Sequence, residues 1–205
     1  MLCAGSSLAG FEQALDRRLI DDALAVGHSR IEAIRTRYHE PYRIQVARPP
    51  VDYTDIVTPF RRVALLAEER AQAGRRLFQS ETIALLGDRA TLVEIFVEMT
   101  FHPLNVFVGV PAYDVELTTV ASGARIDPLR IERIPRFGAR LEGVPLPSRF
   151  VGAPSLPGES QPMLGGTVVA TFSAGALNPN GVYEVVVSEK ERELARVRVD
   201  VGTLR

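Results

Sequence analysis

The chain has 205 residues, of which 46% are hydrophobic and 24% charged, a balance typical of one large or two small folded domains rather than of disordered chains. The 24 lysine and arginine residues are offset by 25 aspartate and glutamate residues, so the chain lacks the excess positive charge that binds nucleic acids and anionic membranes. No run of about 18 apolar residues is present. The sequence therefore predicts neither a nucleic-acid partner nor a transmembrane segment.

Residues 1–10 are small and apolar, and Ser7, Leu8 and Ala9 match the small-x-small pattern of a signal-peptidase site. The charged start and longer apolar run of a complete signal peptide are missing. Two hypotheses follow: residues 1–10 are the end of a signal peptide on an exported or periplasmic protein, or the frayed start of a cytoplasmic one. Cys3, the single cysteine, forms neither an internal disulfide nor, by itself, a zinc site.

Two amphipathic patterns predict helices near the start of the chain. The first covers Phe11 to Ala25, where apolar residues recur every four positions. The second runs to Arg37, with Ser29 as its cap and with Ile31 and Ile34 facing inward. Tyr42 to Ala47 then alternates like a short strand, which needs a partner elsewhere.

A further helix is predicted to begin at Thr58, because a capping hydroxyl here precedes Pro59, a residue suited to the first helical position. Its apolar face begins with Phe60, and its solvated face includes Arg61 and Arg62. Another short helical turn is predicted over residues 80–86.

The period changes to two after Thr91, which predicts β-strands over the rest of the chain. The clearest alternation covers Val93 to Phe101 and Leu194 to Val201. The other candidates are Tyr113–Val120, Arg130–Ile134, Ala139–Val144, Thr167–Phe172 and Val182–Val187. A long loop rich in proline, glycine and serine spans residues 145–166.

These patterns predict an α+β fold, in which a helical N-terminal part is followed by an antiparallel β-sandwich. A partly open β-barrel is the alternative. The predicted organisation is a signal-peptide remnant or disordered start at residues 1–10, a mainly helical region at 11–88 and an all-β domain at 89–205.

No motif of a common enzyme class is present. The three histidines, His28, His39 and His102, lack the helical spacing of a metal site, and no nucleophile elbow, phosphate-binding loop or dinucleotide-binding loop occurs. We therefore expect no metal and no cofactor, and we name no catalytic residue. A catalytic triad assembled from distant residues stays open, because triads are defined by geometry.

The segment from Phe101 to Asp114 differs most from an ordinary connection between strands, because it is apolar where hairpin turns are polar. One interpretation is that residues 106–110 form a buried strand or pack under the N-terminal helices. The other is a ligand-binding or partner-binding loop, with His102, Asn105, Phe107 and Tyr113 as the candidate binding residues.

Three functions are consistent with these observations. The first is a non-enzymatic extracytoplasmic β-sandwich module for binding or assembly, with a protein partner or a second copy of itself. The second is a hydrolytic enzyme with a site at the junction of the helical and β parts. The carboxylates that could converge there are Glu94, Glu98, Asp114 and Glu116. Glu94 and Glu98 lie about 13 Å apart along one strand, which is too far for two carboxylates to act on one bond. The third is a self-associating structural component, which would use exposed strand edges.

Overall fold

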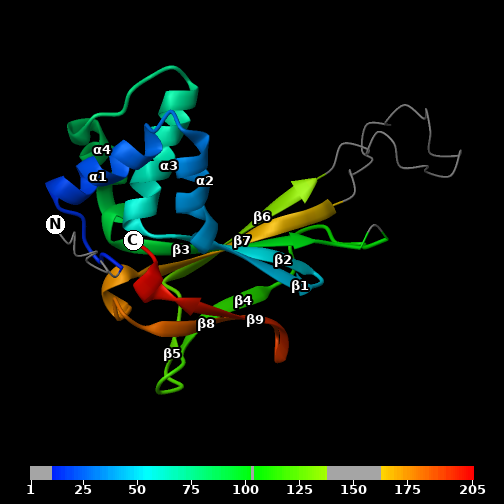
Figure 1. Cartoon of the computed structure of the whole chain (residues 1–205). Helices are drawn as coiled ribbons and strands as arrows, with labels where there is room; N and C mark the ends of the chain where they lie inside the picture. Colours follow the sequence, from blue (N-terminus) through cyan, green and yellow to red (C-terminus); the bar gives the residue numbers. More distant parts are fainter. Residues whose placement is uncertain (1–10, 103, 138–162) are drawn as a thin grey trace, which may run out of the picture.

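The computed structural model describes residues 11–102, 104–137 and 163–205, and within them the chain forms four α-helices and nine strands (Figure 1). The helices are α1 (Arg17–Gly27), α2 (Glu32–His39), α3 (Pro59–Gln72) and α4 (Gln79–Leu86). The expected signal-peptide remnant, the strand over 139–144 and most of the long loop lie outside the described residues. No helix in the described ranges is long and apolar enough to span a bilayer.

The strands form two antiparallel sheets. The five-stranded sheet has the order β1-β2-β3-β7-β6, and the four-stranded sheet has the order β5-β4-β8-β9. The strand bounds are β1 (Arg43–Arg48), β2 (Val51–Val57), β3 (Leu92–Thr100), β4 (Tyr113–Thr119), β5 (Arg125–Ile126), β6 (Arg130–Phe137), β7 (Met163–Ser173), β8 (Val182–Glu189) and β9 (Arg192–Asp200).

The predicted fold class is confirmed: the helices belong to the N-terminal part, and the two sheets pack as a sandwich that is not closed into a barrel (Figure 1). Alternation along the strands explains the packing, since one side of each strand enters the core. On β3, Val93, Ile95, Val97 and Met99 are all at most 2% exposed. A second, smaller core lies among the helices and includes Phe60.

The predicted strand near residue 43 finds its partner in β2, which follows it directly. β2 is missed at the sequence level because Asp52, Thr54 and Asp55 interrupt its apolar pattern. The β1–β2 hairpin pairs with β3 through β2. Residues from the mainly helical region therefore contribute two strands to the five-stranded sheet.

The structure corrects details of each of the first three predicted helices. Helix α1 begins at Arg17 rather than near Phe11, because the Asp16 carboxylate accepts a hydrogen bond from the Leu19 N–H and caps the helix there. Phe11 is instead buried in the sandwich core. The N-cap residue of α2 is Ile31 rather than Ser29, and Ile31 and Ile34 face outward, at 59% and 48% exposed.

Helix α3 begins as predicted, with Thr58 Oγ1 accepting a hydrogen bond from the Arg61 N–H at 3.1 Å. Its first two arginines, however, are buried rather than solvated, at 3% exposed for Arg61 and 6% for Arg62. Arg61 forms an ion pair with Asp55 on β2, and Arg62 lies 3.1 Å from the Glu94 carboxylate on β3. These two ion pairs fasten α3 to the outer face of the five-stranded sheet.

Candidate functional site

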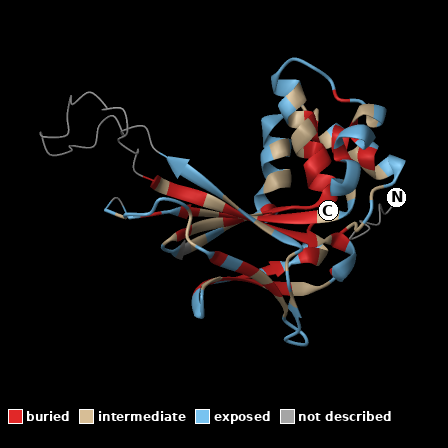
Figure 2. Cartoon of the chain, turned by 180° about the vertical axis from the view of Figure 1, so that it is seen from behind, coloured by how far each residue is buried: buried red, intermediate tan, exposed pale blue. Residues whose placement is uncertain are grey.

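The connection between β3 and β4 carries the most exposed apolar side chains of the described residues. We call residues 104–110 the apolar loop. Leu104, Val106 and Val108 are 83%, 90% and 98% exposed. The loop protrudes, pale blue in Figure 2, from the end of the sheets away from the helices. Scattered exposed apolar residues are common, but three such residues on one short loop form a local concentration of exposed apolar side chains.

Asn105 holds the loop in place. Its Nδ2 donates to the carbonyls of His102 and Met163, both at 2.8 Å, and its Oδ1 accepts from the Phe107 N–H at 3.0 Å. The Phe107 ring packs edge-on against buried Phe101, with centroids 5.2 Å apart. Asn105 and Phe107 thus connect the loop to the body of the protein, and their neighbours Leu104, Val106 and Val108 are exposed to solvent.

The four predicted binding residues lie at different depths. His102 is exposed, and its Nδ1 accepts from the Leu104 N–H at 3.2 Å. Asn105 is half-buried, and Phe107 is 41% exposed. Tyr113 is buried in the sandwich core, where burial first and then the nearby Glu189 raise the pKa of its phenol. The structure therefore connects His102 and Phe107 through Asn105, whereas the Tyr113 ring lies against buried Phe101 and not in the loop.

The interpretation of residues 106–110 as a buried strand, or as a segment under the helices, is wrong. Residues 106–109 form no strand and are exposed, and Val106 and Val108 are 90% and 98% accessible to solvent. The sequence pattern pointed to His102, Asn105, Phe107 and Tyr113, but not to Leu104, Val106 and Val108 as the most exposed side chains. The available signal was that these apolar residues lie in a connection between two strands, because such connections run over the surface.

Two neighbours extend this apolar surface toward the start of β7. Phe137, 48% exposed, pairs with Met163, whose carbonyl binds Asn105. Val110 packs over Gly166, where a Cβ would lie 2.5 Å from the Val110 Cγ2. A larger residue at Gly166 would therefore displace the loop.

A second candidate site is a polar groove of about 680 Å³ at the junction of α2, α3 and β1. At its floor, His39 Nε2 lies 3.2 Å from the Glu68 carboxylate, and its Nδ1 accepts from Arg61 Nε at 3.2 Å. Burial first and then the Arg61 charge lower the pKa of His39. Because both ring nitrogens are engaged, His39 is not free to act as a general base, and the network instead joins α2 to α3.

The carboxylates of the hydrolase hypothesis do not converge. Glu94 and Glu98 lie on the outer face of the five-stranded sheet, while Asp114 and Glu116 lie on the outer face of the four-stranded one, each between buried core residues. Each is within 3.6 Å of a different arginine, in the pairs Glu94–Arg62, Glu98–Arg136, Asp114–Arg133 and Glu116–Arg125. Among the described residues, no group of three or more His, Cys, Asp or Glu side chains is placed to hold a metal ion.

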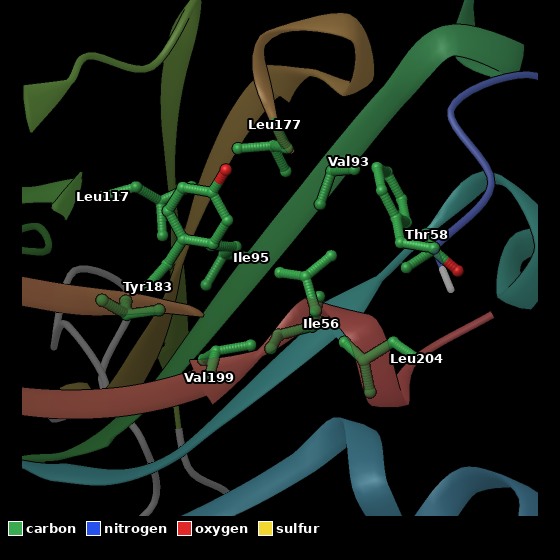
Figure 3. Close-up of a pocket in the computed structure, with 12 residues that line it drawn as sticks. Ile56, Thr58, Val93, Ile95, Leu117, Leu177, Tyr183, Val199 and Leu204 are labelled. Carbon is green, nitrogen blue, oxygen red and sulfur yellow. The ribbon is translucent and has the colours of Figure 1, made fainter. Parts of the chain in front are cut away.

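A small cavity of about 20 Å³ lies between the two sheets (Figure 3). Its lining is almost wholly apolar, and the side chains labelled in Figure 3, among them Ile95, Val199 and Leu204, surround it. The Thr58 hydroxyl at its edge is already engaged, since it caps α3 and donates to the Arg205 carbonyl. A cavity of this volume holds about one water molecule and offers it too few polar partners, so it is a packing gap in the core.

No protein-family model, curated protein or solved structure matches this chain.

Proposed function

We propose that the protein is a non-enzymatic binding or assembly module that docks on another protein surface through the apolar loop. The observation that carries this proposal is the outward row of Leu104, Val106 and Val108 on a loop held by Asn105. Burying a valine or leucine side chain contributes about 1.5–3 kcal/mol, so a partner that covers the row gains substantial free energy.

The anchoring of the loop supports the same conclusion. A contact loop that is already ordered loses little conformational entropy on binding, which favours association. The hydrogen bonds of Asn105 and the packing of Phe107 on Phe101 supply this order. The exposed His102 adds a polar group at the margin of the apolar row, and apolar centres with polar margins are typical of protein interfaces.

The hydrolase hypothesis has weaker support. The polar groove lies where that hypothesis places a site, but His39 is engaged on both nitrogens. Among the described residues that line the groove, Thr36 alone carries a hydroxyl, and none carries a thiol. An activated nucleophile needs a base within hydrogen-bond reach, and the groove does not offer that pair.

Site-specific photo-cross-linking tests the proposal. A photoreactive benzoyl-phenylalanine replaces Val108 in the full chain, which is irradiated in cells of its source. The matched control carries the same group at Leu129, which is 67% exposed on a different connection. We expect a protein adduct of defined mass from position 108 and none from position 129.

A double variant tests whether cross-linking at position 108 depends on the folded shape of the loop. Adding Asn105→Ala to the position-108 chain removes the hydrogen bonds that hold the loop, and we expect the adduct yield to fall several-fold while the circular dichroism of the protein stays unchanged. Equal adduct yields from positions 108 and 129, or no adduct from either, would overturn the proposal.

A further inference from the structure

We propose that the polar groove between α2, α3 and β1 binds a cationic amino acid, or a small derivative that keeps its carboxylate and its positive groups. This site shares no residue with the apolar loop, and the inference does not rest on the proposed function. Helix α2 stands beside α3 and leads into β1, so the groove lies where the helices meet the five-stranded sheet (Figure 1). Its volume of about 680 Å³ is within the range of about 300–1,000 Å³ that small-molecule sites occupy.

Helix α2 turns a polar face to the groove. The groove-lining residues of α2 and its C-cap are three or four positions apart, which places them on one side of the helix. They are Glu32, Arg35, Thr36, His39 and Glu40. No residue of α2 is buried, and its Ile34 faces outward, whereas a surface helix ordinarily turns its apolar side to the body of the protein. Departures from the ordinary pattern are expected at functional sites.

Arg61 supplies a donor for the carboxylate of the ligand. It is buried, yet it lines the groove. Its Nε donates to His39 Nδ1 at 3.2 Å, and its Nη1 donates to the Ile56 carbonyl at 2.6 Å and pairs with Asp55. Its Nη2 donates to none of the described residues, and it is not among the described side-chain nitrogens that lack both a partner and access to solvent. A carboxylate oxygen binds well to such a nitrogen, because few water molecules compete with it there.

Two glutamates at the ends of α2 supply the partners for positive groups. Every arginine that lines the groove is already paired with Glu68 or Asp55. Glu32 and Glu40 line the groove and are exposed, and no arginine of the groove pairs with them. Glu40 follows His39 directly, and Glu32 lies about 12 Å further along the helix. An ammonium next to the bound carboxylate can therefore face Glu40, and a positive group on a long side chain can face Glu32.

The balance of charge in the groove selects against simple anions. Its three arginines are outnumbered by the four carboxylates of Glu32, Glu40, Glu68 and Asp55, and His39 accepts from Arg61 in its neutral form. A phosphate or a dicarboxylate meets net repulsion there. A ligand with one carboxylate and two positive groups is complementary to the same surface.

Isothermal titration calorimetry of the full chain with L-arginine tests this proposal. We expect saturable binding of L-arginine. Agmatine, the same molecule without its carboxylate, should bind about tenfold more weakly, because it leaves the Arg61 Nη2 without its acceptor. L-glutamate, which replaces the positive side chain with a negative one, should bind more weakly still. The comparison of ligands avoids a change at Arg61 itself, which would break its pair with Asp55.

A pair of variants locates the site. Glu40→Gln should weaken the binding of L-arginine about threefold to fivefold, because an exposed carboxylate that faces the ammonium is removed. Glu69→Gln is the matched control, since Glu69 is exposed on α3 and does not line the groove, and it should leave binding unchanged. No binding of L-arginine at millimolar concentration, equal binding of agmatine, or equal effects of the two variants would overturn the proposal. The cross-link from position 108 is unaffected by these outcomes, so the proposed function is tested separately.

Discussion

At the scale of single residues, the buried hydroxyls of Thr54 and Thr58 have opposite effects on stability. Both side chains are at most 1% exposed. The Thr58 hydroxyl caps α3 and donates to the Arg205 carbonyl, whereas the Thr54 hydroxyl has no hydrogen-bond partner among the described residues. A buried polar group without a partner costs free energy that an apolar group of the same shape does not.

We therefore expect Thr54→Val to raise the free energy of unfolding by about 1 kcal/mol, since valine keeps the shape and removes the unpaired hydroxyl. Thr58→Val, the matched control, should lower it by about 1–2 kcal/mol, because the helix loses its cap. Urea denaturation of both variants measures the difference. A destabilised Thr54→Val protein would show that the hydroxyl has a partner after all.

His39 predicts a dependence of stability on pH. Burial and then Arg61 hold the pKa of His39 below its ordinary value of 6.5, while Glu68 and Asp55 oppose this more weakly. The unfolded chain therefore binds the proton more readily than the folded one. The contribution of neutral His39 is fully present above pH 6.5 and is lost as the pH falls from there through the lower, folded pKa.

The test compares the wild-type protein with His39→Gln at several pH values between 5 and 7. The difference in free energy of unfolding, wild type minus variant, should increase with pH and level off above 6.5. His28, whose pKa is also lowered, is present in both proteins and cancels in the difference. A difference that decreases with pH would contradict the assigned direction.

At the scale of elements, the contact between α1 and α3 depends on Gly27. A Cβ at Gly27 would lie 2.2 Å from the Ala64 carbonyl oxygen and 2.6 Å from the Ala67 Cβ. Backbone cannot yield as a flexible side chain can, so Gly27→Ala should push the two helices apart. We expect it to cost about 1–3 kcal/mol in thermal or urea unfolding.

Gly175→Ala is the matched control for this change. Its added Cβ would meet only the Ser173 hydroxyl oxygen, at 3.7 Å, which is an ordinary contact. We expect its free energy of unfolding to remain within about 0.5 kcal/mol of the wild-type value. Equal effects of the two substitutions would show that the helix contact is looser than the geometry indicates.

The elements also show how much the sequence could predict. The cap at Thr58 and the alternation along β3, β4 and β9 are local patterns, and they located α3 and these strands well. The burial of Arg61 and Arg62 could not be found in this way, because their partners Asp55 and Glu94 belong to strands that only the fold brings under α3. The spacing of residues along the chain does not predict ion pairs between residues that are distant in the sequence.

The candidate site, too, was predictable only in its local features. Composition alone indicated that the connection between β3 and β4 is unusual. Which of its side chains face solvent depends on the bond from Asn105 to the Met163 carbonyl, 58 positions further along the chain. That contact follows from the pairing of β7 with β3, so the outward direction of Leu104, Val106 and Val108 became visible only with the fold.

At the scale of the whole molecule, contacts from several parts of the chain join the helices to the sandwich. Phe11, ahead of the first helix, is buried between the sheets, and Gln13 Nε2 donates to the Leu177 carbonyl at 2.6 Å. From the other end of the chain, the Arg205 carbonyl accepts a hydrogen bond from the Tyr42 hydroxyl at 2.9 Å. The β1–β2 hairpin completes the five-stranded sheet. Removing the N-terminal part would therefore take Phe11 out of the sandwich core and two strands out of the five-stranded sheet.

We therefore expect the helices and the sandwich to unfold together. Calorimetry of the full chain should show one transition, with a calorimetric enthalpy close to the van't Hoff enthalpy. A fragment of residues 89–205 should lack the dispersed amide spectrum of a folded domain, because it loses Phe11 and exposes the edge of β3 that β2 covers. Two resolved transitions, or a folded fragment, would show instead that the β part is an independent domain to which the helices are an attachment. In that case the helices would be dispensable for the apolar loop, which lies at the far end of the sheets, and the shorter fragment would suffice to test its binding.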